Sequence, residues 1–66
     1  MQIHLNGDAR DFQDVKTIPD LVAALGLEPT MILIEHNSTA LHRSDWPQTT
    51  LKENDRIEIL QVAAGG

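Results

Sequence analysis

The sequence predicts a small α+β domain in which one main helix lies across a mixed β-sheet. Apolar residues alternate with polar ones near both ends of the chain, in segments 1–5 and 56–59, and this period is typical of half-buried strands. Residues 18–25 instead carry apolar side chains at spacings of three and four, which indicates an amphipathic helix. The 66 residues include no cysteine, so no disulfide supplements the thin core that a domain of this size can form.

The first two strands are expected to form a hairpin. Residues 1–5 are followed by Asn6-Gly7, a dipeptide that tolerates the positive φ angles of a two-residue type I′ turn. Residues 8–12 should therefore fold back antiparallel as the second strand, although only Phe12 among them is strongly apolar.

The main helix has signals at both ends. Thr17 is the expected N-cap, and Asp20 suits the positive end of the helix dipole. Pro19 in the first turn removes an N–H that has no intrahelical partner. Gly26 is placed for the left-handed residue that follows a helix, and Pro29 prevents continuation. Such a short helix should form mainly because its apolar side docks on the sheet.

The middle of the chain predicts two more strands and a capped turn. Residues 31–34 are all apolar, which suggests a central strand covered on both faces. Residues 39–42 form a short candidate strand after a polar break. Ser44 is then the expected cap of a single turn that carries Trp46 and ends at Pro47.

The final strand leaves one alternative open. It follows a turn at residues 53–55, and its Ile57 and Ile59 should face inward. Leu60 and Val62 have the opposite parity. If a bulge shifts the register, these two residues complete the core. If the strand continues regularly, they form an exposed apolar strip on the face away from the helix.

The order of the elements is strand, strand, helix, strand, short strand, strand. A right-handed crossover through the helix connects the second strand to a parallel partner, and the last strand can then lie beside the first. This arrangement is the β-grasp, or ubiquitin-like, fold. We expect residues 1–62 to form its single domain and residues 63–66, which lack a large side chain, to form a flexible C-terminal tail.

The composition argues against several classes of function. Ten acidic and five basic side chains give a formal net charge of -5, which disfavours nucleic acid and favours partners with basic docking surfaces. The start of the chain lacks the pattern of a secretory signal, and no apolar run approaches the length of a membrane span. We therefore expect a cytoplasmic protein without a membrane partner.

No side chain stands out as catalytic or metal-binding. His4, His36 and His42 lack the spacing of metal ligands, and solvated or partly packed histidines are more common. Ser44 and Asp45 with a histidine suggest a nucleophilic site, but capping and turn roles explain both residues better. The sequence therefore predicts neither a catalytic residue nor a metal site.

The end of the chain, Gly65-Gly66, is its most specific chemical feature. Without Cβ atoms this dipeptide can enter a narrow channel and adjust its backbone to a partner. A carboxylate is a poor electrophile, so chemistry at Gly66 needs a second protein that supplies ATP and magnesium. Adenylation by that protein would create a good leaving group. The simpler alternative is a chain end without a function.

Five short stretches of the chain carry a resemblance to a known family. In order, they read Met1-Gln2-Ile3; Glu35-His36-Asn37 followed by Arg43-Ser44-Asp45-Trp46; Leu51-Lys52-Glu53-Asn54-Asp55-Arg56-Ile57-Glu58-Ile59; and Gln61-Val62-Ala63-Ala64-Gly65-Gly66. Together they resemble the ThiS family of sulfur carriers in thiamine biosynthesis, over nearly the whole chain. One departure is Asn54, where the family usually has glycine; asparagine also tolerates a left-handed backbone, so the turn is still expected.

The resemblance implies a carrier whose Gly66 is adenylated by an E1-like enzyme and converted to a thiocarboxylate with sulfur from a donor protein. The carrier would then pass this sulfur to thiazole synthase. The residues expected to thread into a partner are Ala63, Ala64 and Gly65. An exposed strip of Leu60 and Val62 would be well placed to dock the adenylating enzyme. The carrier itself would catalyse nothing and bind no cofactor, since ATP and magnesium belong to the activating enzyme.

Three alternatives stay open. The chain could be the small subunit of a molybdopterin synthase, which uses the same chemistry to deliver sulfur to a pterin, although such chains tend to be longer. It could be a ubiquitin-like modifier that becomes joined to lysines, which would produce covalent ladders on a denaturing gel. It could also be a β-grasp interaction module with an incidental tail, in which case deletion of Gly66 would leave its activity intact.

Overall fold

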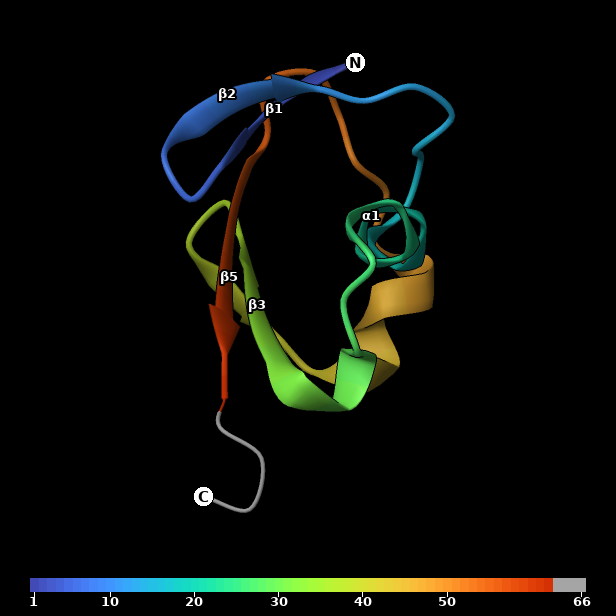
Figure 1. Cartoon of the computed structure of the whole chain (residues 1–66), viewed down its shortest axis with the longest axis vertical. Helices are drawn as coiled ribbons and strands as arrows, with labels where there is room; N and C mark the ends of the chain where they lie inside the picture. Colours follow the sequence, from blue (N-terminus) through green and yellow to red (C-terminus); the bar gives the residue numbers. More distant parts are fainter. Residues whose placement is uncertain (63–66) are drawn as a thin grey trace.

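The structure is a computed structural model that describes residues 1–62 of the chain. Its elements, in order, are β1 (Gln2–Leu5), β2 (Asp8–Asp11), α1 (Ile18–Leu25), the 3-10 helix η1 (Pro29–Met31), β3 (Ile32–His36), β4 (Thr39–Leu41), the 3-10 helix η2 (Arg43–Gln48) and β5 (Arg56–Gln61). The strands form one sheet in the order β2-β1-β5-β3-β4 (Figure 1). β1 and β5 are parallel, and the other neighbouring pairs are antiparallel. The predicted α+β fold with a mixed sheet is confirmed, and the last strand lies beside the first.

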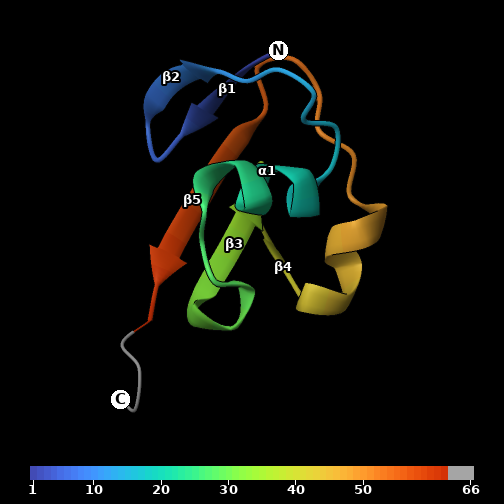
Figure 2. The same ribbon diagram turned by 45° about the vertical axis from the view of Figure 1, so that its right-hand side comes forward.

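The molecule has two layers. α1 crosses one face of the sheet, with η2 beside it, and lies over β3 and β5 (Figures 1 and 2). Within residues 1–62 no helix covers the opposite face, which we call the open face. None of the helices in this part of the chain is long and apolar enough to cross a bilayer.

The first hairpin forms as the sequence predicts. Asn6 and Gly7 have φ angles of 49° and 87°, and both signs match the type I′ turn that connects two antiparallel strands with the correct twist. β2 ends at Asp11, one residue before Phe12, the end of the predicted strand. The backbone N–H of Phe12 still donates to the Met1 carbonyl at 2.8 Å, so the two chain segments stay paired at this point.

α1 begins and ends where the sequence predicts. Thr17 Oγ1 accepts a hydrogen bond from the Asp20 N–H at 3.4 Å, and the Asp20 carboxylate accepts one from the Thr17 N–H at 3.1 Å. Hydrogen bonds from the backbone N–H groups of Lys16 and Thr17 hold the pKa of Asp20 below its ordinary value. Gly26 follows the helix with φ 69°, and its N–H donates to the Ala23 carbonyl. The helix thus has satisfied groups at both ends, as a short helix needs.

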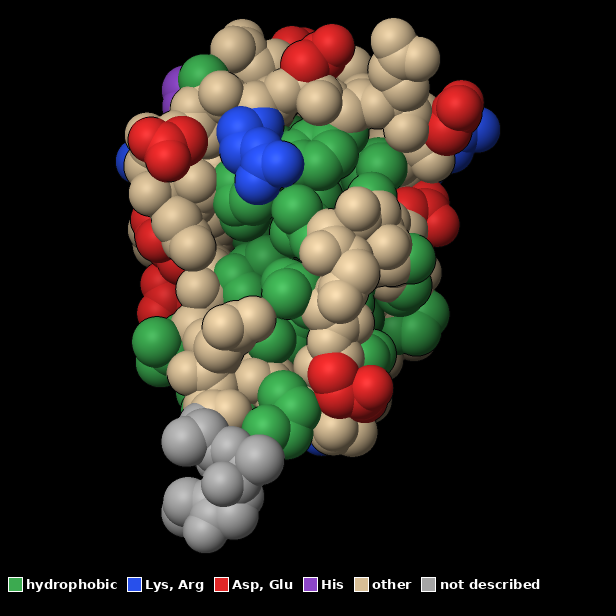
Figure 3. All heavy atoms as spheres, viewed as in Figure 1, with side chains coloured by type: hydrophobic (Ala, Val, Ile, Leu, Met, Phe, Trp, Pro, Cys, Tyr) green, Lys and Arg blue, Asp and Glu red, His purple; other side chains and the backbone are tan. Residues whose placement is uncertain are grey.

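Apolar side chains from both layers form one core. The most deeply buried are Ile3, Ile18, Leu21, Ile34 and Ile57, each with 2% or less of its surface exposed. Three of them come from β1, β3 and β5, and two come from α1. Figure 3 shows apolar side chains filling the space between the sheet and the helix. Burial of each such side chain is worth about 1.5–3 kcal/mol, so this interface supplies much of the stability.

The strand predicted from residues 31–34 differs from the prediction. Met31 belongs to η1, so β3 starts at Ile32. Ile32 and Ile34 are buried on the helix side, but Leu33 is 58% exposed on the open face. The prediction that this strand is covered on both faces is therefore wrong, because an apolar run does not show whether a second layer exists. The middle position in the sheet also belongs to β5 and not to β3.

The turn predicted to start at Ser44 is the 3-10 helix η2, and its N-cap is His42. The Asp45 carboxylate accepts a hydrogen bond from the His42 backbone N–H at 3.1 Å, which fixes this earlier start. Pro47 lies inside η2 and does not end it. The predicted cap is wrong because the Asp45 carboxylate fixes the start of the helix at His42. The predicted end is wrong because a helix this short loses only one hydrogen bond to proline.

Candidate functional site

β5 leads to the end of the chain, and its pairing with β3 is regular. Leu33 lies opposite Leu60 and Ile34 lies opposite Ile59, in a register that no bulge interrupts. The alternation of faces therefore continues to the end of the strand. Leu60 is 63% exposed and Val62 is 40% exposed. The regular-strand alternative is confirmed, and both side chains are accessible.

Leu33 adds a third apolar side chain to this surface. It is the direct cross-strand neighbour of Leu60, and opposed side chains on one face of a sheet are in reach of each other. We call Leu33 and Leu60 the leucine pair. Sequence reasoning missed Leu33 because it assigned this residue to a fully covered strand; the pairing of β3 with β5 is what places it on the open face.

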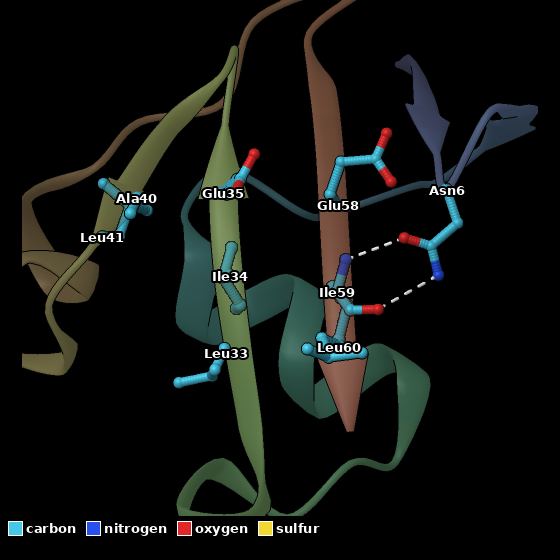
Figure 4. Close-up of a pocket in the computed structure, with 9 residues that line it drawn as sticks. All are labelled: Asn6, Leu33, Ile34, Glu35, Ala40, Leu41, Glu58, Ile59 and Leu60. Carbon is cyan, nitrogen blue, oxygen red and sulfur yellow. Dashed lines mark hydrogen bonds between the residues drawn. The ribbon is translucent and has the colours of Figure 1, made fainter. Parts of the chain in front are cut away.

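Asn6 fixes the position of β5 beside the leucine pair. Its Oδ1 accepts a hydrogen bond from the Ile59 N–H at 2.7 Å, and its Nδ2 donates to the Ile59 carbonyl at 3.3 Å (Figure 4). The backbone pairing of β1 with β5 ends with the hydrogen bond from the Asn6 N–H to the Ile57 carbonyl at 2.9 Å. The side-chain amide of Asn6 then extends the pairing to Ile59. The sequence identified Asn6 only as a turn residue, because its partner lies 53 positions away.

A shallow hollow on the open face contains the leucine pair. Figure 4 shows its lining from the open side, with Leu33 and Leu60 at one end and Glu35 and Glu58 at the other. Ala40 of β4 also lines it, and its small side chain leaves the space above Glu35 free. The hollow joins an apolar end to an acidic end, a combination that suits a partner's protruding side chains.

Asp55 holds the other end of β5 in place. Its carboxylate accepts hydrogen bonds from His36 Nε2 at 2.7 Å, Asn37 Nδ2 at 3.1 Å and the Lys52 N–H at 2.9 Å. The turn predicted at residues 53–55 is confirmed, and it includes Asn54 with φ 68°. This cluster joins the turn before β5 to the end of β3, so it positions the strand and lies away from the leucine pair.

The pKa of Asp55 reflects two opposing effects. Burial raises the pKa, because it removes water from the charged form. Hydrogen bonds from His36 and Asn37, followed by that from the Lys52 N–H, stabilise the charged form and outweigh the burial. The net pKa lies below the ordinary value of 3.8, so Asp55 is ionised at neutral pH.

The described histidines show no common site. His36 is bound to Asp55, while His4 lies on β1 and His42 caps η2. In residues 1–62 no group of three or more histidine and carboxylate side chains is placed to hold a metal ion. That the protein binds no metal stays a prediction from the sequence.

The predicted reactive residue, Gly66, lies outside the described residues. The same holds for the residues expected to thread into a partner, which are Ala63, Ala64 and Gly65. The described part of the predicted site therefore consists of Leu60 and Val62, to which the structure adds Leu33 and Asn6.

The fold and the exposed strip on β5 define a small ubiquitin-like protein of the β-grasp class. A model of the ThiS family matches residues 3–66. The chain therefore belongs to the ThiS family.

Similar proteins agree with this assignment. The sulfur carrier protein ThiS of Bacillus subtilis (strain 168) is 32% identical over 65 residues, which cover 97% of this chain and 98% of that protein. A crystal structure of the thiamine biosynthesis protein ThiS from Geobacter metallireducens has a TM-score of 0.83 and 26% identity, with 100% of both chains covered.

Two further relatives are larger. A protein named thiazole synthase from Magnetococcus marinus (strain ATCC BAA-1437 / JCM 17883 / MC-1) is 32% identical over 66 residues, which cover 100% of this chain and 20% of that protein. A thiazole synthase from Paramagnetospirillum magneticum (strain ATCC 700264 / AMB-1) is 27% identical over the same length. The chain thus spans about a fifth of the length of these two relatives.

Proposed function

We propose that this chain is a sulfur carrier of thiamine biosynthesis and that the backbone carboxylate of Gly66 carries the sulfur. The observation that supports the proposal most strongly is the match to the ThiS family over residues 3–66, which includes the terminal diglycine. The similarity to the Bacillus subtilis sulfur carrier over 97% of this chain adds to it.

The proposed chemistry takes place on partner enzymes. On an E1-like adenylating enzyme, a Gly66 carboxylate oxygen attacks the α-phosphorus of ATP, and pyrophosphate leaves. The terminal sulfur of a persulfide on a donor protein then attacks the acyl carbon, and AMP departs. A second thiol attacks the donor's sulfur in the resulting acyl disulfide, which breaks the S–S bond, forms a new disulfide and leaves Gly66 as a thiocarboxylate. ATP and magnesium belong to the activating enzyme, and the carrier contributes no catalytic side chain or cofactor. The proposal includes a cytoplasmic location, where ATP is available.

The surface around β5 gives the adenylating enzyme a place to bind. Leu60 and Val62 are exposed and immediately precede the tail, so an enzyme that covers them is close to Gly66. Leu33 enlarges this apolar surface. In the proposal, residues 63–65 enter the active site while these side chains hold the domain outside it.

Thiazole synthase is the proposed acceptor of the sulfur. Two relatives that are named thiazole synthase contain a segment similar to this whole chain, which supports a functional association of the two. This support favours the thiamine pathway over a molybdopterin synthase, the principal alternative.

Intact-mass analysis tests the proposal. The chain is incubated with the adenylating enzyme, ATP and a sulfur source, and we expect one oxygen at Gly66 to be replaced by sulfur. The matched control lacks Gly66 and leaves the described domain unchanged, so it should stay unmodified. If the full chain also stays unmodified while the enzyme consumes ATP with a known carrier, the proposal is wrong. The alternative of a β-grasp interaction module with an incidental tail is then favoured. Covalent ladders on other proteins would instead identify a modifier.

A further inference from the structure

Two glutamates occupy directly opposed positions of neighbouring strands on the open face of the sheet. Glu35 of β3 lies directly opposite Glu58 of β5, one step along the same face from the leucine pair. Both belong to the lining of the hollow, and Figure 4 shows the Glu58 side chain directed away from β3, toward the side of Asn6. Cβ atoms of directly opposed residues are about 4.5–5.5 Å apart, and like charges in this position repel each other.

The described part of the chain does not neutralise this pair. Within residues 1–62 the ion pairs join the Met1 ammonium to Asp11 and His36 to Asp55, and neither involves Glu35 or Glu58. Nor does either carboxylate accept a hydrogen bond from another described side chain. The formal net charge of -5 adds to the repulsion. Within residues 1–62, neither carboxylate has an ion-pair partner, although Arg56 lies two residues before Glu58 on the same face of β5.

The neighbours of the pair leave it accessible. Ala40 is the cross-strand neighbour of Glu35 on the side of β4, and it is too small to cover the carboxylate. On the side of Glu58, the Asn6 amide is occupied by the backbone of Ile59. A side chain from another protein can therefore enter the hollow between the two glutamates.

We propose that Glu35 and Glu58 together receive one arginine side chain of the adenylating enzyme, while an apolar side chain of the same enzyme packs on the leucine pair. The N–H donors of a guanidinium group lie in one plane and point outward from several of its edges, so one group can bind two carboxylates at once. A compact ammonium group does this less well. The apolar contact beside it excludes water and strengthens the ion pairs.

The charge of the hollow favours the adenylating enzyme as the occupant. This inference rests on the proposed function, in which the enzyme binds the triphosphate of ATP close to the point where Gly66 enters. An enzyme that binds a triphosphate has a positive electrostatic potential around that site, and this potential attracts the acidic surface of the carrier. The acidic pair lies two residues farther from the tail than the leucine pair but lines the same hollow. An enzyme that covers Leu60 beside the inserted tail therefore also reaches the two carboxylates.

Isosteric neutralisation tests the proposal. The double variant E35Q/E58Q keeps the shape of both side chains and removes their charges. The matched control is D8N/D14N, which removes two charges from residues that do not line the hollow. For each protein we would measure the dissociation constant for the adenylating enzyme over a range of salt concentrations, and KM and kcat from pyrophosphate release. Circular dichroism establishes that every variant is folded.

We expect E35Q/E58Q to raise the dissociation constant and KM about tenfold at low salt, to flatten the salt dependence, and to leave kcat nearly unchanged. The control should shift binding by less than about twofold. The proposal is overturned if both double variants bind alike. It is also overturned if the loss appears with thiazole synthase and not with the adenylating enzyme.

Failure of this inference is distinguishable from failure of the proposed function. If the wild-type chain acquires sulfur at Gly66 and E35Q/E58Q binds like the control, only the arginine contact is wrong. If the wild-type chain never acquires sulfur, the carrier function itself is wrong.

Discussion

Both faces of the sheet carry aliphatic side chains, but those on one face are buried and those on the other are exposed. On the helix side, Ile34 and Ile57 are 2% and 0% exposed. On the open side, Leu33 and Leu60 are 58% and 63% exposed, although they come from the same two strands. Stability accounts for the first group, because α1 covers it. No element of residues 1–62 covers the second group, so its apolar character is better explained by contact with a partner.

We expect this contrast to separate residues that hold the domain together from residues that serve the proposed binding of a partner. Substitutions on the helix side should lower the free energy of unfolding and affect binding only through unfolding. Substitutions on the open face should affect binding and leave the free energy of unfolding nearly unchanged. The predictions below test this separation, from the largest expected effect to the smallest.

Ile57→Ala should have the largest effect. The side chain is fully buried between β5 and the helix, and its truncation leaves a cavity that costs about 3 kcal/mol. The loss is a large part of the stability of a domain of this size, which is roughly 3–10 kcal/mol. Urea unfolding followed by the fluorescence of Trp46, the only tryptophan, measures it. A loss below about 1 kcal/mol would mean that the helix side is not the dominant core.

Asp55→Ala should cost about 2 kcal/mol, because His36, Asn37 and the Lys52 N–H lose a shared acceptor. The control Asp8→Ala removes an exposed charge and should change the free energy of unfolding by less than about 0.5 kcal/mol. Equal effects of the two substitutions would show that the cluster around Asp55 contributes nothing beyond its charge.

The pH dependence of unfolding provides a second test of the Asp55 cluster. The pKa of Asp55 is lowered in the folded protein, so the folded state binds its proton less readily than the unfolded state. The stabilisation is complete above the ordinary value of 3.8 and is lost as the pH falls through the lower, folded-state pKa. Asp55→Ala should lose this part of the acid sensitivity, which urea titrations at a series of pH values would measure.

Leu60→Ala should separate the two faces most clearly. We expect a dissociation constant for the adenylating enzyme about tenfold higher, since an exposed apolar side chain beside the tail is placed to become an anchor. The free energy of unfolding should change by less than about 0.5 kcal/mol. Isothermal titration calorimetry and urea unfolding on the same sample measure both quantities. A loss of stability without a loss of binding would reverse the assignment of this face.

Thr17→Ala should lower the free energy of unfolding by about 1 kcal/mol, because α1 loses the side-chain acceptor at its N-terminus. The helix lies on the covered side of the sheet, so the dissociation constant for the partner should not change. Thr17→Ser keeps the acceptor and is the matched control. A change in binding with a fully folded Thr17→Ala variant would indicate that the two faces are coupled.

Glu58→Gln should have the smallest effect on stability, and it should stabilise the domain where the other substitutions destabilise it. Removal of one of two opposed charges should raise the free energy of unfolding by about 0.5 kcal/mol. Chemical denaturation at low and high salt measures the gain, which salt should reduce. A gain in stability together with weaker binding would show that the open face keeps repulsive charges for its partner. Unchanged or lower stability would argue against repulsion between Glu35 and Glu58.

Local signals in the sequence determined most of the elements. Asn6-Gly7, the Thr17 cap and Gly26 act within a few residues, so the hairpin and the ends of α1 agree with the prediction. The same holds for the turn at residues 53–55 and for the alternation of β5. These features depend on backbone conformation and on hydrogen bonds between near neighbours, which a short stretch of sequence encodes.

Only the tertiary structure decided which apolar residues are covered. Leu33 lies between two buried isoleucines and has a similar hydrophobicity, yet it is exposed because no element of residues 1–62 covers the open face. The hydrogen bonds of Asn6 join it to Ile59, 53 positions away in the sequence. Glu35 and Glu58 lie opposite each other although 23 positions, 58 minus 35, separate them. The sequence by itself therefore determined most of the elements and the chemistry expected at Gly66. The proposed docking surface depended on strand pairing between distant segments, because side-chain exposure is a property of the whole arrangement and not of any one segment.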